Sequence, residues 1–345
     1  MTVGRKRPVP EPDRAARRVT IADVAAAAGV SSMTVSRVVN GTGRVNEATR
    51  ERVRHYVDLL GYQPNQVARS LSTKQSRTVG LVVPDITNPF FPEIVRGAED
   101  AAWEDGYTVA LATAVEDPVR ERAAILNFEA HRLDGLSVCS PRLPDAELAE
   151  IVSRHPASVL VNRKLEEGTA VSLMVDDIKG ATLAVDFVAG RGHERVALLA
   201  GPDRSASAHV RRRGFVEAME RAGLPVDERM ILTCEPTEEA GDRALRTLLA
   251  RGERFTAVIA YNDVMAIGVQ QAAASLGLSV PGDLVVVGCD DVRMASLVTP
   301  PLTTLRVDTY ALGRQAVETI FALRRGERRQ HHVYTPELVV RGSAP

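Results

Sequence analysis

Eight short apolar runs lie between residues 78 and 291, and segments of helical length separate most of them. In chain order the runs are TVGLVVP, YTVALAT, DGLSVCS, ASVLVNR, VSLMVDD, RVALLAGP, TAVIAYND and LVVVGCDD. Two of the intervening segments, residues 91–105 and 211–222, are amphipathic and are predicted to be crossover helices. Strands that alternate with helices are typical of parallel sheets, because a parallel connection needs room for a crossover. The sequence therefore predicts an α/β body, and its length predicts two sheets in two lobes.

The chain before residue 78 has a helical pattern instead. Thr20 is a predicted N-cap for a helix that ends at Gly29, and Ser31 is a predicted N-cap for the next helix. In the second helix, valines at positions i, i+3 and i+4 are expected to face a core, with Arg37 and small polar residues opposite them. Two short helices around a Gly-Val-Ser turn are typical of a helix-turn-helix, whose second helix reads bases in the major groove. The alternative is an ordinary pair of helices in an all-α core, because the pattern alone is not specific.

Two further helical segments follow. Asn46 is a predicted N-cap for a third helix, which ends at Gly61. After Pro64, residues 65–71 have room for about two helical turns. A helix this short is marginal alone because nucleation is unfavourable, so it is expected to form only with support from a partner.

The charge of the chain is unevenly divided. All 345 residues together have a formal net charge of −1. Residues 1–77 contain 14 Lys or Arg and 6 Asp or Glu, which gives +8 and leaves −9 for the rest of the chain. A basic head on an acidic body is typical of a nucleic-acid-binding module joined to a domain with a different task.

The ends and the cysteines of the chain indicate its compartment. Residues 1–18 are basic and Pro-rich without an apolar centre, so they predict a disordered basic tail and not a secretory signal. No apolar run reaches membrane-spanning length, so no membrane partner is expected. Cys139, Cys234 and Cys289 lie far apart, and neither a disulfide framework nor a metal site follows from them. We expect a cytoplasmic, nucleoid-associated protein.

Motifs for catalysis are missing from the sequence. It contains no GxGxxG at a strand–helix turn and no GxSxG, and no Ser/His/Asp or Cys/His group can be placed on neighbouring strand ends. We therefore expect no cofactor and no enzyme activity. A periplasmic sugar receptor would explain the body, but it would explain neither the basic head nor the missing signal.

Polar residues follow the predicted strands at their C-terminal ends. The set is Asp85 and Asn88, Asn162 and Arg163, Asp176 and Asp177, Asn262 and Asp263, and Asp290 and Asp291. Ligands bind at this edge of open α/β sheets, so the set predicts a polar crevice between two lobes. Several members, notably Asp177 and Asp263, are also expected as helix N-caps. The crevice suits a polyhydroxylated small molecule, with Phe90 or Phe91 stacking on a sugar face.

Three stretches together carry a family resemblance: VTIADVAAAAGVSSMTVSRVVNG, YQPNQVARSL and GLVVPDITNPFF. From about Val19 to its end, the chain resembles the LacI/GalR family of bacterial transcriptional repressors. The resemblance implies an α-helical helix-turn-helix DNA-binding domain plus hinge helix, joined to an α/β periplasmic-binding-protein-like domain of two parallel-sheet lobes. The implied segments are the tail 1–18, the DNA-binding domain 19–63, the hinge helix and linker 64–77, and the effector-binding and dimerisation domain 78–345. Within the last, lobe one is expected at about 78–175 and 306–332, and lobe two at about 176–305 and 333–341.

The resemblance also implies which residues contact DNA. Base-reading positions are matched by Ser32, Met33 and Arg37, and phosphate contacts by Thr34, Ser36, Asn40, Asn46 and Tyr62. The minor-groove hinge is matched by Asn65, Ala68 and Leu71. Leu71 is expected to wedge into the minor groove at the centre of the operator and to kink the duplex. Two protomers place their hinge helices in one groove, so a homodimer and a palindromic operator of double-stranded DNA are implied together.

The family binds its small-molecule effector between the lobes, and a sugar is the expected ligand here. Effector-contacting positions are matched by Asp85, Phe90, Asn162, Arg211, Asn262 and Asp290. Ser205 and Ser207 differ from the purine-responsive members, which disfavours a purine corepressor. A dimer is expected, because no leucine heptads follow TPELVVRGSAP. A regulator of the same fold controlled by a protein corepressor or a non-sugar ligand is the alternative.

Overall fold

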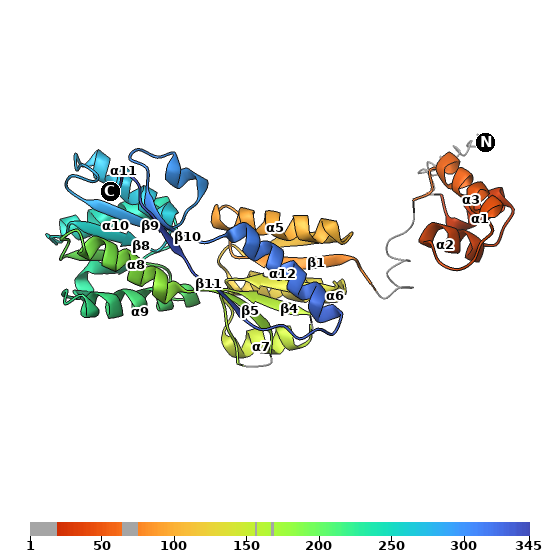
Figure 1. Ribbon diagram of the computed structural model, residues 1–345, viewed down its shortest axis with the longest axis horizontal. Coiled ribbons are helices and arrows are strands. Elements are labelled where there is room, and N and C mark those ends of the chain that lie inside the picture. Colours follow the sequence, from red (N-terminus) through yellow and green to blue (C-terminus); the bar gives the residue numbers. More distant parts are fainter. Residues whose placement is uncertain (1–18, 64–74, 156, 167–168) are drawn as a thin grey trace, which may run out of the picture. The chain divides into compact units, whose positions relative to one another are not determined.

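The computed structural model describes residues 19–63, 75–155, 157–166 and 169–345. The chain divides into two compact units, one ending at Ser76 and the other running from Arg77 to Pro345 (Figure 1). In the described residues the first unit is helical, and every strand belongs to the second. The expected tail, residues 1–18, and most of the expected hinge, residues 64–74, lie outside the described residues.

The described residues of the first unit form three helices, α1 (Ile21–Ala28), α2 (Ser32–Asn40) and α3 (Glu47–Leu60). Thr20 and Asp23 form a capping box at the start of α1. The Thr20 N–H donates to the Asp23 carboxylate at 2.8 Å, and the Asp23 N–H donates to the Thr20 hydroxyl at 3.3 Å. Ser31 and Asn46 cap the next two helices, and a glycine in the left-handed region follows each helix. The three predicted N-caps are therefore confirmed, as are the predicted ends of the first and third helices at Gly29 and Gly61.

The second unit contains two six-stranded sheets, one in each lobe. The first sheet has the order β11-β5-β4-β3-β1-β2, and the second has the order β12-β10-β9-β8-β6-β7. The strands of the first sheet are β1 (Thr78–Val83), β2 (Thr108–Thr113), β3 (Gly135–Cys139), β4 (Ser158–Val161), β5 (Val171–Val175) and β11 (His332–Tyr334). Those of the second are β6 (Val196–Ala200), β7 (Ile231–Thr233), β8 (Ala257–Ala260), β9 (Val285–Asp290), β10 (Thr303–Arg306) and β12 (Glu337–Val339). Neighbouring strands are parallel except β10 and β12.

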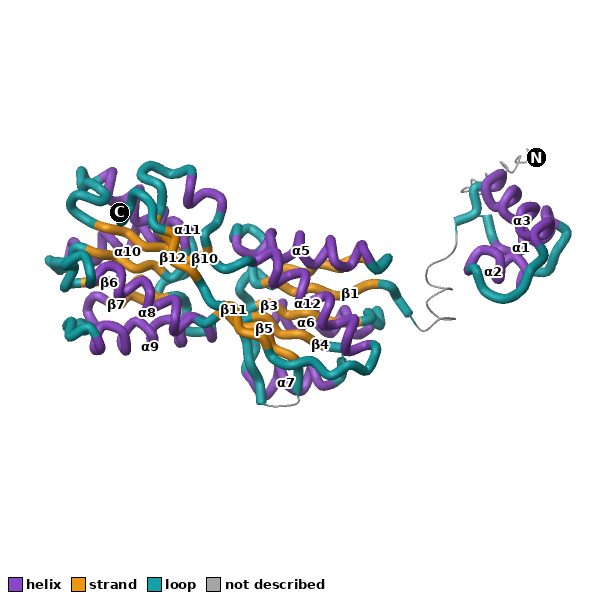
Figure 2. Tube along the Cα trace, in the orientation of Figure 1, coloured by secondary structure: helices purple, strands orange, loops and turns teal. Residues whose placement is uncertain are grey.

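Helices cover both faces of each sheet (Figure 2). The first sheet lies between one pair, α5 (Phe90–Glu104) and α12 (Thr309–Arg324), and another, α6 (Pro118–Ala130) and α7 (Asp145–Ser153). The second lies between α8 (Asp177–Ala189) with α9 (Ala206–Arg221) and α10 (Glu238–Ala250) with α11 (Asp263–Ser275). Two short 3₁₀ helices, η1 (Glu228–Met230) and η2 (Arg293–Ser296), complete the second lobe. Because both faces of each sheet are covered, most strands are apolar at every position, which explains the eight continuous runs.

The predicted fold class is confirmed, and all eight predicted strands are present. The boundaries differ in two places. β11 pairs with β5, so the first lobe reaches Tyr334 and the expected change of lobe after residue 332 is two residues early. α9 begins at Ala206 and not at residue 211, because the Ser205 hydroxyl caps it. The chain passes between the lobes three times, after β5, after β10 and after β11.

Two glycines let α5 and α12 cross closely. A Cβ atom at Gly313 would lie 2.0 Å from the Ile94 carbonyl oxygen, and one at Gly97 would lie 2.1 Å from the Tyr310 carbonyl oxygen. These neighbours are backbone atoms, so the two helices would have to move apart. We expect Gly313→Ala to destabilise the protein by about 1–3 kcal/mol and to lower the midpoint of its thermal unfolding.

Gly180→Ala is the matched control for this substitution. Gly180 is also helical, but its Cβ would meet side-chain atoms of Leu305 and Pro336, each at 3.3 Å. Side chains can move by a few tenths of an ångström, so this variant should lose less stability. Equal unfolding midpoints for the two variants would contradict the close crossing of α5 and α12.

Candidate functional site

The exposed face of α2 presents Ser32, Met33 and Arg37 to solvent. Met33 is 65% exposed, which leaves a large apolar side chain open to a partner. Val35 points the other way into the core of the first unit, so packing fixes the orientation of the helix. Among the described residues, none accepts a hydrogen bond from the Arg37 guanidinium, and its donors are available to a ligand. A short helix with a free guanidinium and small polar groups fits the major groove, where arginine can donate two hydrogen bonds to guanine.

The residues matched to phosphate contacts differ in what they already bind. Thr34 shares a hydrogen bond with the hydroxyl of the helix cap, and the Asn40 amide donates to the Ser36 hydroxyl at 3.2 Å. Asn46 uses its carbonyl oxygen to cap α3, which leaves its amide N–H groups for another acceptor. Tyr62 packs against the core of the unit. The three hinge residues, Asn65, Ala68 and Leu71, lie outside the described residues.

A cavity of about 540 Å³ lies between the lobes of the second unit. Residues that follow β3 and β4 line it from the first lobe, and the turn before α9 lines it from the second. Its polar and charged residues are Arg142, Asp145, Asn162, Arg163, Lys164, Asp177, Asp203, Arg204, Ser207 and His209. This volume is typical of small-molecule sites. Donors and acceptors are both present, so the cavity suits a ligand with several hydroxyl groups.

Arg211 of α9 is the centre of a buried cluster beside this cavity. Its Nε donates to the Asp177 carboxylate at 2.7 Å, and its Nη1 donates to the Tyr261 carbonyl oxygen at 2.5 Å. Its Nη2 lies 4.0 Å from the Asp290 carboxylate. Burial acts to lower the pKa of Arg211, but the nearby negative groups, Asp177 first among them, together outweigh it and the pKa lies well above its ordinary value. Asp177 also lines the cavity, so the cluster extends to the ligand space.

Asp290 has an unusual backbone and an unusual environment. Its φ of 124° lies in a region that residues other than glycine rarely adopt. Burial raises the pKa of Asp290 well above its ordinary value, although the Arg211 charge opposes this. Strained backbone and perturbed carboxylates concentrate at functional sites.

Two of the polar strand ends are helix caps, but the caps lie one residue earlier than expected. Asp176 caps α8 and Asn262 caps α11. Asp177 and Asp263 are the first residues of those helices, so the expectation that they are N-caps is wrong. Asp177 joins the arginine cluster, and Asp263 accepts a 2.5 Å hydrogen bond from the Thr304 hydroxyl. Burial raises the pKa of Asp263 to about 6.

Three of the six residues matched to effector contacts lie at or beside the cavity. Asn162 lines it directly, at the end of β4, with a positive φ of 54°. Its carbonyl oxygen accepts a hydrogen bond from the Val175 N–H at 3.2 Å, which orients its amide. Arg211 and Asp290 belong to the adjoining cluster.

The other three matched residues have structural partners in this arrangement. Asn262 is 1% exposed, and its carbonyl oxygen caps α11. Asp85 accepts two hydrogen bonds from Thr87 within its own turn. Phe90 packs edge-on against Phe91 in the core of the first lobe. Both rings lie away from the lining of the cavity in the part of the chain that the structure describes, so this arrangement gives no support to stacking on a sugar.

Sequence reasoning missed most of the charged residues of the cavity. Arg142 lies three residues after the end of β3, and Arg204 lies in the GPDRSAS stretch after β6. The signal that identified Asn162 was a polar residue directly after a predicted strand. The same signal would have found these two arginines if the whole turn after each strand had been included.

Membrane and metal sites are not found in the part of the chain that the structure describes. None of the described helices is long and apolar enough to cross a membrane. The same residues contain no group of three or more His, Cys, Asp or Glu placed to hold a metal ion.

Comparison with protein families matches both units of the chain. The model for bacterial regulatory proteins of the lacI family matches residues 20–65. The model for a periplasmic binding protein-like domain matches residues 185–344.

Curated relatives and solved structures match almost the whole chain. The HTH-type transcriptional regulator GalR of Escherichia coli K12 is 37% identical over 326 residues, which cover 94% of this chain and 95% of GalR. The HTH-type transcriptional repressor CytR of the same organism is 34% identical over 329 residues, which cover 94% of this chain and 96% of CytR. The Lac repressor dimer bound to operator and the anti-inducer ONPF has a TM-score of 0.87 at 30% identity. The match covers 95% of this chain and 99% of the Lac repressor chain. The complex of the transcriptional regulator CelR with cellobiose has a TM-score of 0.72 at 31% identity. The match covers 94% of this chain and 100% of the CelR chain.

Proposed function

The chain belongs to the lacI family of bacterial regulatory proteins, and from this premise we propose how its two units work together. It is a helix-turn-helix transcriptional regulator with a periplasmic-binding-protein-like effector domain, in a family of regulators and not of enzymes. We propose that it represses transcription by binding a palindromic DNA operator as a homodimer in the cytoplasm. A sugar bound between the two lobes controls its affinity for the operator.

The cavity between the lobes is the observation that carries the proposed control. Residues of both lobes line it, so the contacts of a ligand depend on how the lobes are placed. The three passages of the chain between the lobes can act as a hinge. A ligand that binds one placement more tightly shifts the protein towards it. Two solved relatives support a sugar-like ligand here. The Lac repressor dimer is bound to operator and the anti-inducer ONPF, and CelR is bound to cellobiose.

The exposed face of α2 carries the proposed DNA reading. Ser32, Met33 and Arg37 contact base edges, and the five residues around them contact phosphates. Residues 19–63 form the reading domain, and residues 64–77 form the hinge. Binding is expected to weaken as the salt concentration rises, because the basic head releases counterions from DNA.

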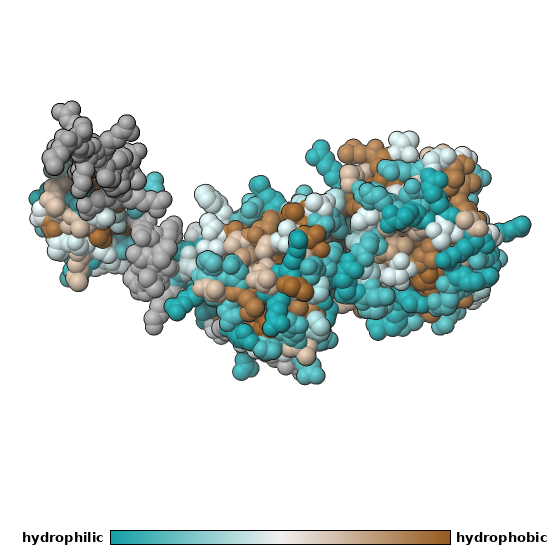
Figure 3. All heavy atoms as spheres, turned by 180° about the vertical axis from the view of Figure 1, so that it is seen from behind, coloured by the Kyte–Doolittle hydropathy of each residue, from teal (hydrophilic) through white to brown (hydrophobic). Residues whose placement is uncertain are grey.

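Exposed apolar residues support the proposed homodimer. β2 is the edge strand of the first sheet, and Leu111 on it and Val115 and Val119 after it are exposed. In the second lobe, Leu297 after η2 is 69% exposed. Figure 3 shows apolar residues at the surface of both lobes, between hydrophilic areas. A second copy of the chain would cover such residues and the open edge of β2.

The hinge leucine gives a test of how DNA is bent. Leu71→Ala should weaken operator binding and reduce bending of the duplex, because an apolar wedge between base steps kinks DNA. Bending is measured by energy transfer between dyes at the two ends of an operator duplex. Leu59→Ala, the same substitution at an exposed leucine of α3 that is not among the proposed DNA contacts, is the control. Unaltered bending by the Leu71 variant would refute the wedge.

The effector proposal is tested by operator affinity in the presence of sugars. The dissociation constant for the operator is measured by fluorescence anisotropy, alone and with each of a panel of mono- and disaccharides that includes cellobiose. At least one sugar should change this constant by about 5-fold or more, which is the usual range of allosteric coupling. Affinity for a random duplex should stay constant. An operator affinity that no sugar changes would contradict control by a sugar.

A further inference from the structure

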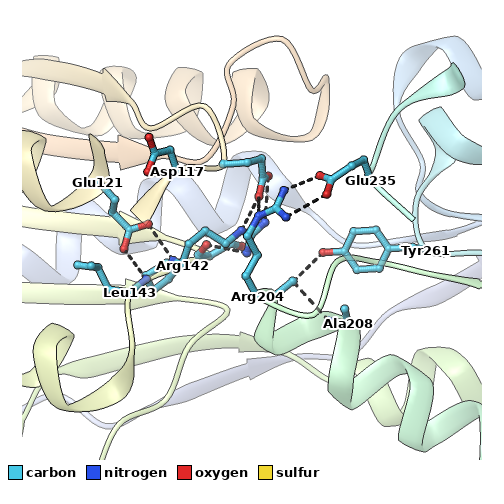
Figure 4. Close-up of polar contacts among 12 residues, drawn as sticks. Asp117, Glu121, Arg142, Leu143, Arg204, Ala208, Glu235 and Tyr261 are labelled. Atoms are coloured by element: carbon cyan, nitrogen blue, oxygen red, sulfur yellow. Dashed lines mark hydrogen bonds and ion pairs between the residues drawn. The ribbon is translucent and has the colours of Figure 1, made fainter. Parts of the chain in front are cut away.

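Four charged residues form a row that crosses from one lobe to the other beside the cavity. Glu116 and Arg142 belong to the first lobe, and Arg204 and Glu235 belong to the second. The Glu116 carboxylate accepts two hydrogen bonds from Arg142, at 2.6 and 3.0 Å. The Glu235 carboxylate accepts two from Arg204, at 3.0 and 2.5 Å. Figure 4 shows Arg204 directed at Glu235, with Arg142 next to it.

The first-lobe half of the row is held rigidly. The backbone N–H groups of Arg142 and Leu143 donate to the buried carboxylate of Glu121, at 2.8 and 3.1 Å (Figure 4). The Arg142 side chain is 3% exposed and also donates to the Ser140 carbonyl oxygen. Glu116 itself has a positive φ of 58°, and the two hydrogen bonds from Arg142 hold its carboxylate in place.

The second-lobe half is also fixed, but it leaves one donor without an acceptor. The paired hydrogen bonds to Glu235 determine the direction of the Arg204 guanidinium, and they raise the pKa of Arg204 above its ordinary value. Among the residues that the structure describes, none accepts a hydrogen bond from the buried Nε of Arg204. The carboxylate oxygen of Glu116, across the gap between the lobes, lies 3.6 Å from this nitrogen.

A small movement of the lobes would decide whether this last bond forms. An N–H···O bond has a usual N···O distance of about 2.9 Å, so the lobes need to approach by about 0.7 Å at this point. If the lobes separate, Glu116 keeps Arg142 and loses the charge of Arg204. The contact between Glu116 and Arg204 therefore depends on lobe placement. The pair Glu116–Arg142 and the pair Arg204–Glu235 each lie within one lobe and do not depend on it.

We propose that Glu116 and Arg204 form an interlobe clasp, which stabilises the approach of the two lobes in the ligand-free protein and closes fully when a ligand draws them together. The clasp deepens the proposed function, since it sets how far the effector site is already closed before the effector binds. Arg142 and Arg204 also line the cavity, so a bound ligand contacts both sides of the clasp. A more open ligand-free protein must close further on binding, and this lowers its apparent affinity for a ligand of the closed form.

The clasp is tested by the distance between the lobes in the full-length chain. Dyes are placed on cysteines introduced at Ala123 in α6 and Ala250 in α10, which are both exposed. Burial raises the pKa of Cys139 to about 12 and that of Cys234 to about 11, and it raises the pKa of Cys289 well above its ordinary value, so the three native thiols react slowly. Single-molecule energy transfer then gives the distribution of interlobe distances without DNA or sugar.

Arg204→Gln should shift this distribution towards larger interlobe distances. The share of open molecules should be larger than in the labelled wild-type chain. Arg221→Gln is the matched control, because it makes the same change at an arginine whose exposed ion pair, with Asp186, lies within the second lobe. This control should keep the wild-type distribution. An Arg204→Gln distribution that equals the wild-type distribution would overturn the clasp.

A double-substitution cycle separates the clasp from a local effect on folding. In a Glu116→Gln background, Arg204→Gln should have no further effect on the distance distribution, because the clasp is already lost. Independent, additive effects would overturn the proposal. If Arg204→Gln does not fold, Arg204→Lys keeps the charge and should give an intermediate distribution, and an unchanged one would count against the clasp. A wild-type chain that binds neither operator nor sugar would contradict the proposed function, and the distances would still decide the clasp.

Discussion

Arg211→Ala should abolish the response of operator binding to the effector and should destabilise the second unit by about 3–5 kcal/mol, the usual effect of removing one partner of a buried ion pair. Arg211 neutralises Asp177 at 2.7 Å and lies 4.0 Å from Asp290. Its loss leaves both carboxylates buried without a counterion, next to the space where the ligand binds. Operator affinity without effector should be kept, because the helices that read DNA belong to the other unit. The measurements are thermal unfolding and operator anisotropy with and without the active sugar.

Arg212→Ala is the control for this prediction. Arg212 is the next residue of α9, and its ion pair with Glu228 is largely exposed. Exposed pairs contribute about 0–1 kcal/mol, so this variant should keep both its stability and its response. Arg211→Lys keeps the positive charge and should fold better than Arg211→Ala, but it cannot reach Asp177 and the Tyr261 carbonyl oxygen together. A full response in the lysine or alanine variant would remove Arg211 from the effector site.

Arg37→Ala should weaken binding to the operator by about 1–3 kcal/mol, the range for a bidentate contact between arginine and guanine. This corresponds to about a 5- to 150-fold increase in the dissociation constant. Arg37 is exposed on α2, and Val35 anchors the same helix in the core, so the substitution is not expected to unfold the first unit. Binding to a random duplex should weaken much less.

Arg54→Ala provides a control with the same loss of charge. Arg54 is exposed on α3 and is not among the residues proposed to read bases. Its removal should weaken specific and random binding by similar factors, through the electrostatic attraction to phosphates alone. If Arg37→Ala behaves in this way too, Arg37 does not read a base.

Local signals in the sequence were sufficient for most of the fold. Thr20 with Asp23, Ser31 and Asn46 identify three helix starts, because an N-cap is decided by a hydrogen bond within three residues. Eight strands were identifiable because parallel sheets covered on both faces need apolar residues at consecutive positions. β7, with three residues at the edge of its sheet, has too little apolar sequence to give this signal.

The site depends on contacts between distant residues, and local patterns predicted less of it. Whether the cap of α11 is Asn262 or Asp263 depends on where the helix begins, and a shift of one residue exchanges their roles. The pairing of Glu116 with Arg204 joins two turns that are distant in sequence, and no local pattern indicates it. Arg211, in contrast, was identified through its place in the family pattern, and the structure places it in a buried cluster beside the cavity.

Selection of DNA from a random pool tests the central claim most directly. The purified full-length chain is incubated with a pool of duplexes that carry a random central segment, and the bound fraction is amplified and sequenced over several rounds. A dimer that reads bases through α2 should enrich one palindromic site, with two half-sites related by two-fold symmetry. A bound fraction that stays as random as the starting pool would contradict sequence-specific DNA binding by this protein.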